Sequence, residues 1–156
     1  MPDRIVSAFD ASSTAADVVR GMDLSDRTAL VTGGGSGIGI EIVRALAGAG
    51  ARVIVGDIDE KGAREAAAGI LAEHPVARID NRHLDLGDLA SVRAFAAGVL
   101  RDYPRLDIMI NNAGVMTPPL MRTKQGHELQ FGVNFLGHFL LTSLLEPALV
   151  ASGRAR

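Results

Sequence analysis

The sequence predicts an α/β protein whose doubly wound parallel sheet stops after the fourth strand and the helix that follows it. Three observations lead to this fold class. Short apolar runs alternate along the chain with longer segments in which apolar residues recur at helical spacing. A glycine-rich loop joins the first apolar run to the first of these helices. The second apolar run ends on an acidic residue, Asp57.

Two regions are expected along the 156-residue chain, which has the ordinary length of one domain. Residues 1–26 are mixed and polar, and predict an N-terminal arm that carries one short helix at about residues 15–19. Residues 27–156 contain all the expected strands and long helices. We therefore expect them to form a single domain.

The first strand, helix and second strand are expected over residues 28–57. Residues 29–31 are a short buried strand that ends at three glycines, and apolar residues then recur at helical spacing from Ile38 to Leu46. Gly48 and Gly50 end this helix, and residues 52–57 supply the second buried strand. The segment therefore reads as a complete βαβ unit.

The second half of the chain repeats the alternation. The expected elements are, in chain order, a helix at 60–71, a strand at 77–84, a helix that begins after an N-cap at Asp88, a strand at 106–110, a turn at 117–119 and a long helix from 128 to about 149. Strands that alternate with helices form parallel sheets through right-handed crossovers.

Composition excludes several classes of function. The formal net charge is −2 and there is no long lysine or arginine run, so we expect no nucleic-acid partner. The chain has no cysteine, which excludes a disulfide framework and a thiolate metal site. No apolar stretch approaches the ~20 residues of a membrane span, and no signal peptide is recognised. A cytoplasmic protein without a membrane span is the expectation.

The loop from Thr32 to Gly39 predicts a phosphate-binding turn. Gly33 permits a tight turn, Gly37 lets the backbone approach a pyrophosphate, and Gly39 lets the helix pack close to the strand. Free N–H groups at the start of the helix would then hold the phosphates. A flexible turn without a ligand is the alternative. The loop residues expected at the cofactor are Thr32, Gly33, Gly35, Ser36, Gly37, Ile38 and Gly39.

Asp57 predicts NAD as the cofactor, with NADP less favoured. It follows the glycine loop at close to the ~20-residue offset at which an acid receives the adenosine ribose hydroxyls. Its carboxylate would accept hydrogen bonds from both adenosine ribose hydroxyls of NAD but would repel the 2′-phosphate of NADP. The glycine loop holds no arginine or lysine, and Lys61 lies beyond the strand end. A solvated carboxylate at a strand end is the alternative role.

These motifs resemble, in this order, those of the short-chain dehydrogenase/reductase family, whose fold is of the Rossmann type. The loop is similar to the family's Thr-Gly-x-x-x-Gly-x-Gly, and Asp85 is similar to the aspartate that contacts the adenine ring. Residues 111–114 match its Asn-Asn-Ala-Gly signature, while residues 13–25 and 128–139 look most like the retinol-dehydrogenase-like branch. The resemblance covers the N-terminal half of the family. It implies an incomplete NAD-binding domain over residues 27–156 and hydride transfer between a nicotinamide and an alcohol or carbonyl.

The resemblance also assigns cofactor contacts after the third and fourth strands. Asp85 and Leu86 are expected at the adenine, although Asp85 has a loop or helix-cap role as its alternative. Asn112, Ala113 and Gly114 would border the cofactor ribose. The Asn111 and Asn112 amides are expected to tie the end of the fourth strand to neighbouring backbone.

The resemblance assigns one supporting catalytic residue, Asn134. Its match in the family holds a water of the proton relay through the helix backbone. A hydrogen bond within the seam between sheet and helix is its alternative role. The family's tyrosine, followed four positions later by lysine, is not found. Tyr103 precedes the fourth strand and is followed by Pro-Arg-Leu-Asp, and Ser143 and Ser152 precede any fifth strand. The chain alone is therefore expected to be inactive.

No metal site is expected, since the four histidines lack ligand spacing and read as surface or seam residues. Two functions stay open: a truncated oxidoreductase acting on a small-molecule alcohol or carbonyl, or an inactive dinucleotide-binding module or interaction fragment. A purely structural protein would leave the cofactor loop unexplained. An open fourth strand at residues 108–110 further predicts self-association or a homo-oligomer.

Overall fold

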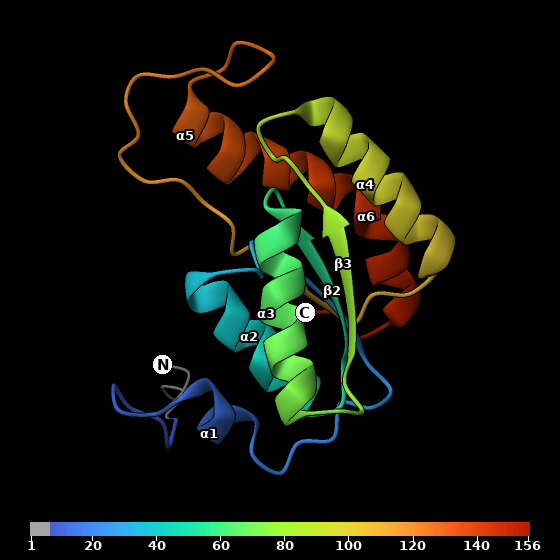
Figure 1. Cartoon of the computed structure of the whole chain (residues 1–156). Coiled ribbons are helices and arrows are strands. Elements are labelled where there is room, and N and C mark those ends of the chain that lie inside the picture. Colours follow the sequence, from blue (N-terminus) through green and yellow to red (C-terminus); the bar gives the residue numbers. More distant parts are fainter. Residues whose placement is uncertain (1–6) are drawn as a thin grey trace, which may run out of the picture.

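Four parallel strands form one sheet in the order β3-β2-β1-β4 (Figure 1). The strands are β1 (Thr28–Thr32), β2 (Arg52–Asp57), β3 (Arg78–His83) and β4 (Ile108–Ile110). This computed structural model describes residues 7–156, so the first six residues of the predicted arm lie outside the described residues. The order and the parallel pairing confirm the predicted Rossmann-type sheet.

Helices cover both faces of the sheet. Their bounds are α1 (Ala15–Val19), α2 (Gly37–Gly48), α3 (Glu60–Glu73), α4 (Leu89–Asp102), α5 (Leu129–Phe131), the π-helical turn η1 (Gly132–Gly137) and α6 (His138–Ser152). Helices α2 and α3 pack on one face, α4 and α6 on the other, and α1 contacts α2 (Figure 1). The predicted short helix of the arm is confirmed.

Alternation along the strands separates the two cores. Ala29 and Val31 of β1 pack with the core under α2 and α3, whereas Leu30, between them, packs with the core under α4 and α6. Side chains of a strand point alternately to its two faces, so a strand buried on both faces is a continuous apolar run. This is why the two apolar runs at 29–31 and 53–55 indicated central strands.

Two acidic N-caps fix where helices begin. The Asp88 carboxylate accepts a hydrogen bond from the N–H of Ala90, which confirms the predicted cap of α4. Asp59 accepts one from the N–H of Gly62 at the start of α3.

The long helix predicted from residue 128 to about 149 is confirmed as the helical segment Leu129–Ser152, but it is not regular throughout. A π-helical turn, which the apolar spacing did not predict, lies between α5 and α6. Such a turn inserts one extra residue, and apolar spacing over a long segment does not resolve a single insertion. Phe131, Phe135 and Phe139 stack along the exposed side with centroids 5.3 and 6.1 Å apart.

The helical segment Leu129–Ser152 is long and apolar enough to cross a membrane, by length and composition alone. The expectation of no such stretch is therefore wrong: this segment reaches 24 residues with a single charged side chain, Glu146, although polar residues such as Asn134 interrupt its apolar pattern. In this fold Leu141, Leu145 and Ala148 are buried in the core that α6 shares with α4.

The outer edge of β4 is partly paired. The N–H of Arg156 donates to the carbonyl of Asp107 at 3.0 Å, and the N–H of Met109 donates to the carbonyl of Arg156 at 2.9 Å. The expectation of an unprotected edge is thus corrected at these positions, because the last residue of the chain lies alongside the strand.

Candidate functional site

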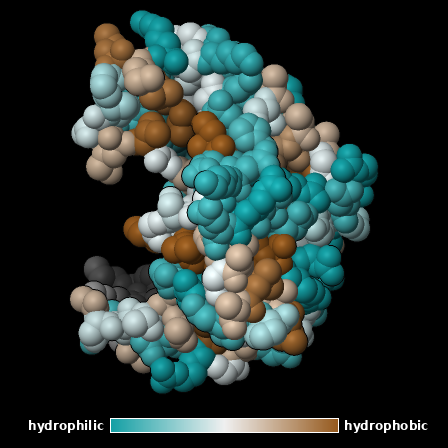
Figure 2. Space-filling view, viewed as in Figure 1, coloured by the Kyte–Doolittle hydropathy of each residue, from teal (hydrophilic) through white to brown (hydrophobic). Residues whose placement is uncertain are grey.

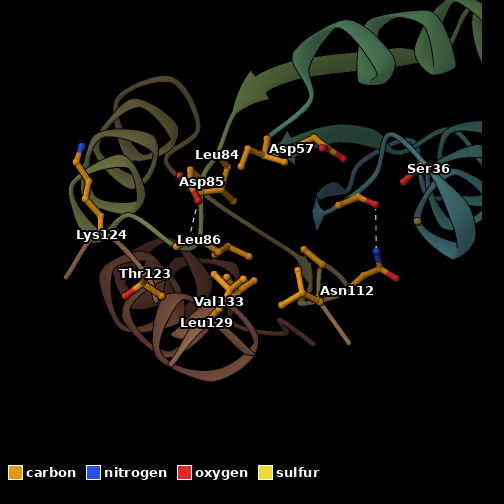
Figure 3. A pocket seen from close by; sticks show the side chains of 18 of the residues that line it. Ser36, Asp57, Leu84, Asp85, Leu86, Asn112, Thr123, Lys124, Leu129 and Val133 are labelled. Carbon is orange, nitrogen blue, oxygen red and sulfur yellow. Dashed lines mark hydrogen bonds between the residues drawn. The ribbon is translucent and has the colours of Figure 1, made fainter. Parts of the chain in front are cut away.

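The carboxyl ends of all four strands meet at one edge of the sheet, where a cavity of about 660 Å³ opens (Figure 3). We call it the strand-end cavity. Figure 2 shows this side of the molecule hollowed between the segment after β4 and the first turn of α2. The predicted residues that line it are Gly33, Ser36, Ile38, Gly39, Asp57, Asp85, Leu86, Asn112, Ala113 and Gly114. A volume of this size is typical of sites for small molecules and cofactors.

Four predicted residues do not line the strand-end cavity: Thr32, Gly35, Gly37 and Asn134. Residues that the sequence did not indicate line it instead, chiefly Arg122, Thr123, Lys124, Leu129 and Val133. All five come from the part of the chain after β4. Leu129 and Val133 fall in the 128–139 stretch of the family resemblance, whereas Arg122, Thr123 and Lys124 belong to no motif and reach the cavity only through the path of the chain.

The glycine turn has the geometry expected of it. Gly33 has φ +66°, and a Cβ on it would lie 2.9 Å from the Cα of Ala113. A Cβ on Gly39 would overlap the carbonyl oxygen of Gly33. Gly37 has φ +53°, and a Cβ there would meet open space. The tight turn and the close packing of helix on strand are therefore confirmed.

The start of α2 leaves its backbone donors available. Ser36 is the N-cap residue, and its side chain makes no capping hydrogen bond within residues 7–156. Ser36, Ile38 and Gly39 line the strand-end cavity. The first N–H groups of a helix have no partner inside the helix, and they carry a partial positive charge that attracts anions.

Asp57 is held in a fixed orientation at the end of β2. Its Oδ2 accepts the N–H of Gly35 at 2.9 Å, and its Oδ1 accepts the N–H of Asp59 at 3.0 Å. Each carboxylate oxygen can accept a second hydrogen bond. Asp57 therefore ties the glycine loop to the strand end and keeps acceptor capacity toward the strand-end cavity.

Asp85 makes the loop contact that was its alternative role, and its contact with an adenine stays a prediction. Its Oδ1 accepts the N–H of Gly87 at 2.8 Å, which is a loop contact, and its side chain also lines the strand-end cavity (Figure 3). Leu86 lies beside it on the same wall. The cavity at this end is thus bounded by the Asp85 carboxylate, the apolar side chain of Leu86 and the polar side chains of Thr123 and Lys124.

The segment after β4 is tied to the glycine turn. Asn112 donates through Nδ2 to the carbonyls of Thr32 and Gly33, at 2.9 and 3.1 Å, as expected. Asn111 was expected to bind neighbouring backbone as well, but its Nδ2 donates to Oγ1 of Thr142 on α6. That expectation is wrong for Asn111, whose amide reaches the hydroxyl of α6 at 3.2 Å.

Asn134 adopts its alternative role in the seam. Its Oδ1 accepts the N–H of Val115 and its Nδ2 donates to the carbonyl of Val115, each at 2.8 Å. Both ends of the amide are thereby satisfied by one residue of the neighbouring segment. This fixes the turn after Gly114, where a Cβ would lie 3.3 Å from the Asn134 Oδ1.

Tyr103 lies away from the strand-end cavity. Its hydroxyl donates to Asp80 at 2.7 Å, and its ring contacts the guanidinium groups of Arg52 and Arg82. Burial, and then the hydrogen bond to Asp80, raise the pKa of Tyr103. These contacts fit the sequence interpretation that this tyrosine is not the family's proton donor.

The other rejected groups also have structural partners. Ser143 donates to the carbonyl of Phe139, and Ser152 donates to Asp107. Among residues 7–156, no group of three or more histidine, aspartate or glutamate side chains could hold a metal ion.

The family model described as short chain dehydrogenase matches residues 27–156. The short-chain dehydrogenase TIC 32 A, chloroplastic, of Brassica napus is 44% identical over 148 residues, which are 95% of this chain and 46% of the relative. Human retinol dehydrogenase 13 is 45% identical over 130 residues, 83% of this chain and 39% of the relative. The chain thus spans less than half the length of these relatives.

Solved structures agree with the fold. An uncharacterised protein from Mycobacterium paratuberculosis superposes with a TM-score of 0.76 at 42% identity, over 88% of this chain and 47% of that one. A metagenomic short-chain oxidoreductase in complex with NADP gives 0.73 at 33% identity, over 85% of this chain and 60% of that one. One relative is named chloroplastic, so the cytoplasmic location stays a prediction, as does self-association.

Proposed function

The chain belongs to the short-chain dehydrogenase family, and on this premise we propose that residues 27–156 are the dinucleotide-binding part of an NAD-dependent oxidoreductase acting on a small-molecule alcohol or carbonyl. One observation carries the proposal: the strand-end cavity joins the glycine turn, the start of α2 and Asp57. Those three features supply an approach for a pyrophosphate, donors for its charge and an acceptor for a ribose.

The residues present fit a dinucleotide. Gly37 faces open space, so the backbone at the start of α2 can be approached without a side chain in the way. The N–H groups of this first turn would hold the pyrophosphate. Asp57, oriented by Gly35 and Asp59, would accept the ribose hydroxyls, and Asp85 would receive the amino group of the adenine. When bound, the nicotinamide supplies or accepts the hydride.

The charges around Asp57 support NAD over NADP. Two cations line the strand-end cavity, but both have partners: the Lys124 Nζ pairs with Asp88 at 2.7 Å, and Arg122 donates to the carbonyl of Gly126 at 2.8 Å. Figure 3 shows Lys124 directed away from Asp57. A 2′-phosphate beside Asp57 would meet a carboxylate, and repulsion between like charges would weaken its binding.

A second candidate is a module that binds the dinucleotide without turnover. The observation that favours it is the place of Tyr103, whose hydroxyl is bonded to Asp80 outside the strand-end cavity. Purified chain would then bind NAD but form no NADH with a panel of alcohols. NADH formation that depends on Asp57 would exclude this second candidate.

Titration calorimetry with NAD, NADP and ADP-ribose tests the proposal. We expect binding of NAD and ADP-ribose and weaker binding of NADP. Asp57→Asn should weaken NAD binding about 10- to 100-fold, the equivalent of losing hydrogen bonds to a charged acceptor. It should also reduce the difference in affinity between NAD and NADP. Asp59→Asn is the matched control, since Asp59 caps α3 and does not line the strand-end cavity. Folded chain that gives no heat with NAD or ADP-ribose at millimolar concentration refutes the proposal.

A further inference from the structure

His138 forms a link between the glycine turn and the helical segment that carries Asn134. It is the first residue of α6, directly after the π-helical turn, and is 6% exposed. Its Nε2 lies 2.8 Å from the Thr32 Oγ1, and its Nδ1 lies 3.1 Å from the Asn134 carbonyl oxygen. The ring therefore joins the helical segment to the glycine turn through a contact between residues 106 positions apart in the sequence, His138 and Thr32.

The two partners determine where the ring proton lies. A carbonyl oxygen can only accept, so Nδ1 of His138 must carry the proton that it donates to Asn134. Burial lowers the pKa of His138, although the hydrogen bond to Asn134 opposes this, and the ring is therefore neutral near pH 7. A neutral imidazole protonated on Nδ1 has a bare Nε2, which accepts the hydroxyl proton of Thr32.

This arrangement uses the whole hydrogen-bonding capacity of Thr32, which is fully buried. With its proton directed to His138, the hydroxyl oxygen accepts the N–H groups of Asn112 and Ala113, each at 3.0 Å. The other acceptor within reach, the Ile110 carbonyl, lies at 3.5 Å. A hydroxyl has one proton and two lone pairs, so its rotation is fixed by these three partners.

The position of Ala113 bears directly on the strand-end cavity. Ala113 and Asn112 both line it, and the Cα of Ala113 lies against Gly33, where a Cβ would come within 2.9 Å. Because of this close packing, the backbone of the segment after β4 is in direct contact with the glycine turn. A hydroxyl that rotated away from these two N–H groups would leave that of Ala113 unpaired and would let the wall at Ala113 shift, whereas the N–H of Asn112 would keep the carbonyl of Ile110 as an acceptor at 3.1 Å.

We propose that His138 is a positioning residue for the dinucleotide: its imidazole orients the Thr32 hydroxyl, which holds Asn112 and Ala113 against the glycine turn. The inference rests on the proposed function, because it takes the strand-end cavity as the dinucleotide site. It adds a residue that does not line the strand-end cavity and acts on it through Thr32. It also means that a series of hydrogen bonds through His138 connects the helical turn of Asn134 to the glycine loop.

Two substitutions separate the contacts of the ring. His138→Gln puts an amide oxygen near the place of Nε2 and retains an acceptor for Thr32. His138→Asn puts its amide near Nδ1, where it can donate to the Asn134 carbonyl, but it is too short to reach Thr32. Thr32→Val removes the hydroxyl at nearly constant volume. These three variants, with the double variant Thr32→Val/His138→Asn, form the test set.

Proton–nitrogen NMR of the free chain provides a first readout that needs no ligand. We expect the neutral tautomer with the proton on Nδ1 of His138. The amide signal of Ala113 should move in His138→Asn and stay near its original position in His138→Gln. A tautomer protonated on Nε2, or an Ala113 signal unchanged in His138→Asn, overturns the proposal. This readout stays valid even if NAD and ADP-ribose do not bind, so the failure of the proposed function is recognised separately.

Calorimetry with ADP-ribose provides the second readout. His138→Asn should weaken binding about 5- to 10-fold, as expected for one lost hydrogen bond, and His138→Gln should restore it to within about twofold. Thr32→Val should weaken binding by at least as much, and adding His138→Asn to it should have no further effect. Equal affinity of His138→Asn and the original chain, or full additivity in the double variant, contradicts the proposed route through Thr32.

Discussion

Replacing Gly39 by alanine tests how closely α2 packs on the glycine turn. A Cβ at this position would overlap the carbonyl oxygen of Gly33 and come within 2.8 Å of Asn112 Nδ2. The turn has little freedom to yield, because Asn112 also donates to that carbonyl at 3.1 Å. We expect overpacking to cost about 1–3 kcal/mol, and the loss of this hydrogen bond to add about 1 kcal/mol.

Gly69→Ala is the matched control. Gly69 lies within α3, and a Cβ there would meet nothing within 4 Å. Alanine exceeds glycine in helix propensity by about 1 kcal/mol at both positions, so the difference between the two variants isolates the overlap. Gly69→Ala should raise the free energy of unfolding by about 0.5–1 kcal/mol. The free energy of unfolding of Gly39→Ala should be about 2–4 kcal/mol lower than that of Gly69→Ala.

Urea unfolding followed by circular dichroism gives both free energies, and thermal melts should separate the two variants by at least about 4 °C for a domain of this size. ADP-ribose affinity should also fall in Gly39→Ala, because the start of α2 must move away from the turn. Equal unfolding midpoints of the two variants would falsify the close packing inferred at Gly39.

The hydrogen bond from Lys124 lowers the pKa of Asp88 to about 2, so a carbon NMR titration should give that midpoint and Lys124→Met should raise it. Because the folded pKa lies below the ordinary 3.8, the stabilisation is present above about pH 4 and is lost as the pH falls toward 2; an unchanged midpoint in the variant contradicts this. Asp107→Asn should destabilise the chain by about 1–3 kcal/mol in urea unfolding, since this buried carboxylate accepts the Thr28 N–H and the Ser152 hydroxyl, each at 2.9 Å. Ser152→Ala should lower the free energy of unfolding by about 1 kcal/mol. If Asp107→Asn and Ser152→Ala both unfold at the same urea concentration as the original chain, Asp107 has no structural role.

Much of the fold follows from local pattern. The apolar runs that became β1 and β2 are buried on both faces, and the helices between strands show apolar residues on one side. The glycine turn was predictable because Gly33 must adopt a positive φ and Gly39 must lack a side chain. These requirements lie within a few residues of one another, so they can be recognised in the sequence.

The partners of the polar side chains were much less predictable. Asn111 was expected to bind backbone and instead donates to Thr142, and the π-helical turn was not expected. The sequence marked His138 as a surface or seam residue, but nothing local indicated Thr32 as its partner. Hydrogen bonds between distant segments depend on distances of a few tenths of an ångström, which residue type and spacing do not specify.

The succession of strands and helices, the glycine turn and the acidic residue at the end of β2 could all be predicted from residue pattern. Each depends on backbone conformation or burial over a short stretch of chain. Three other features could not be predicted in this way: Arg122–Lys124 line the strand-end cavity, Arg156 pairs with β4 and His138 reaches Thr32. These contacts arise when the whole sheet and both helix layers are in place, because the packing of those layers selects each partner.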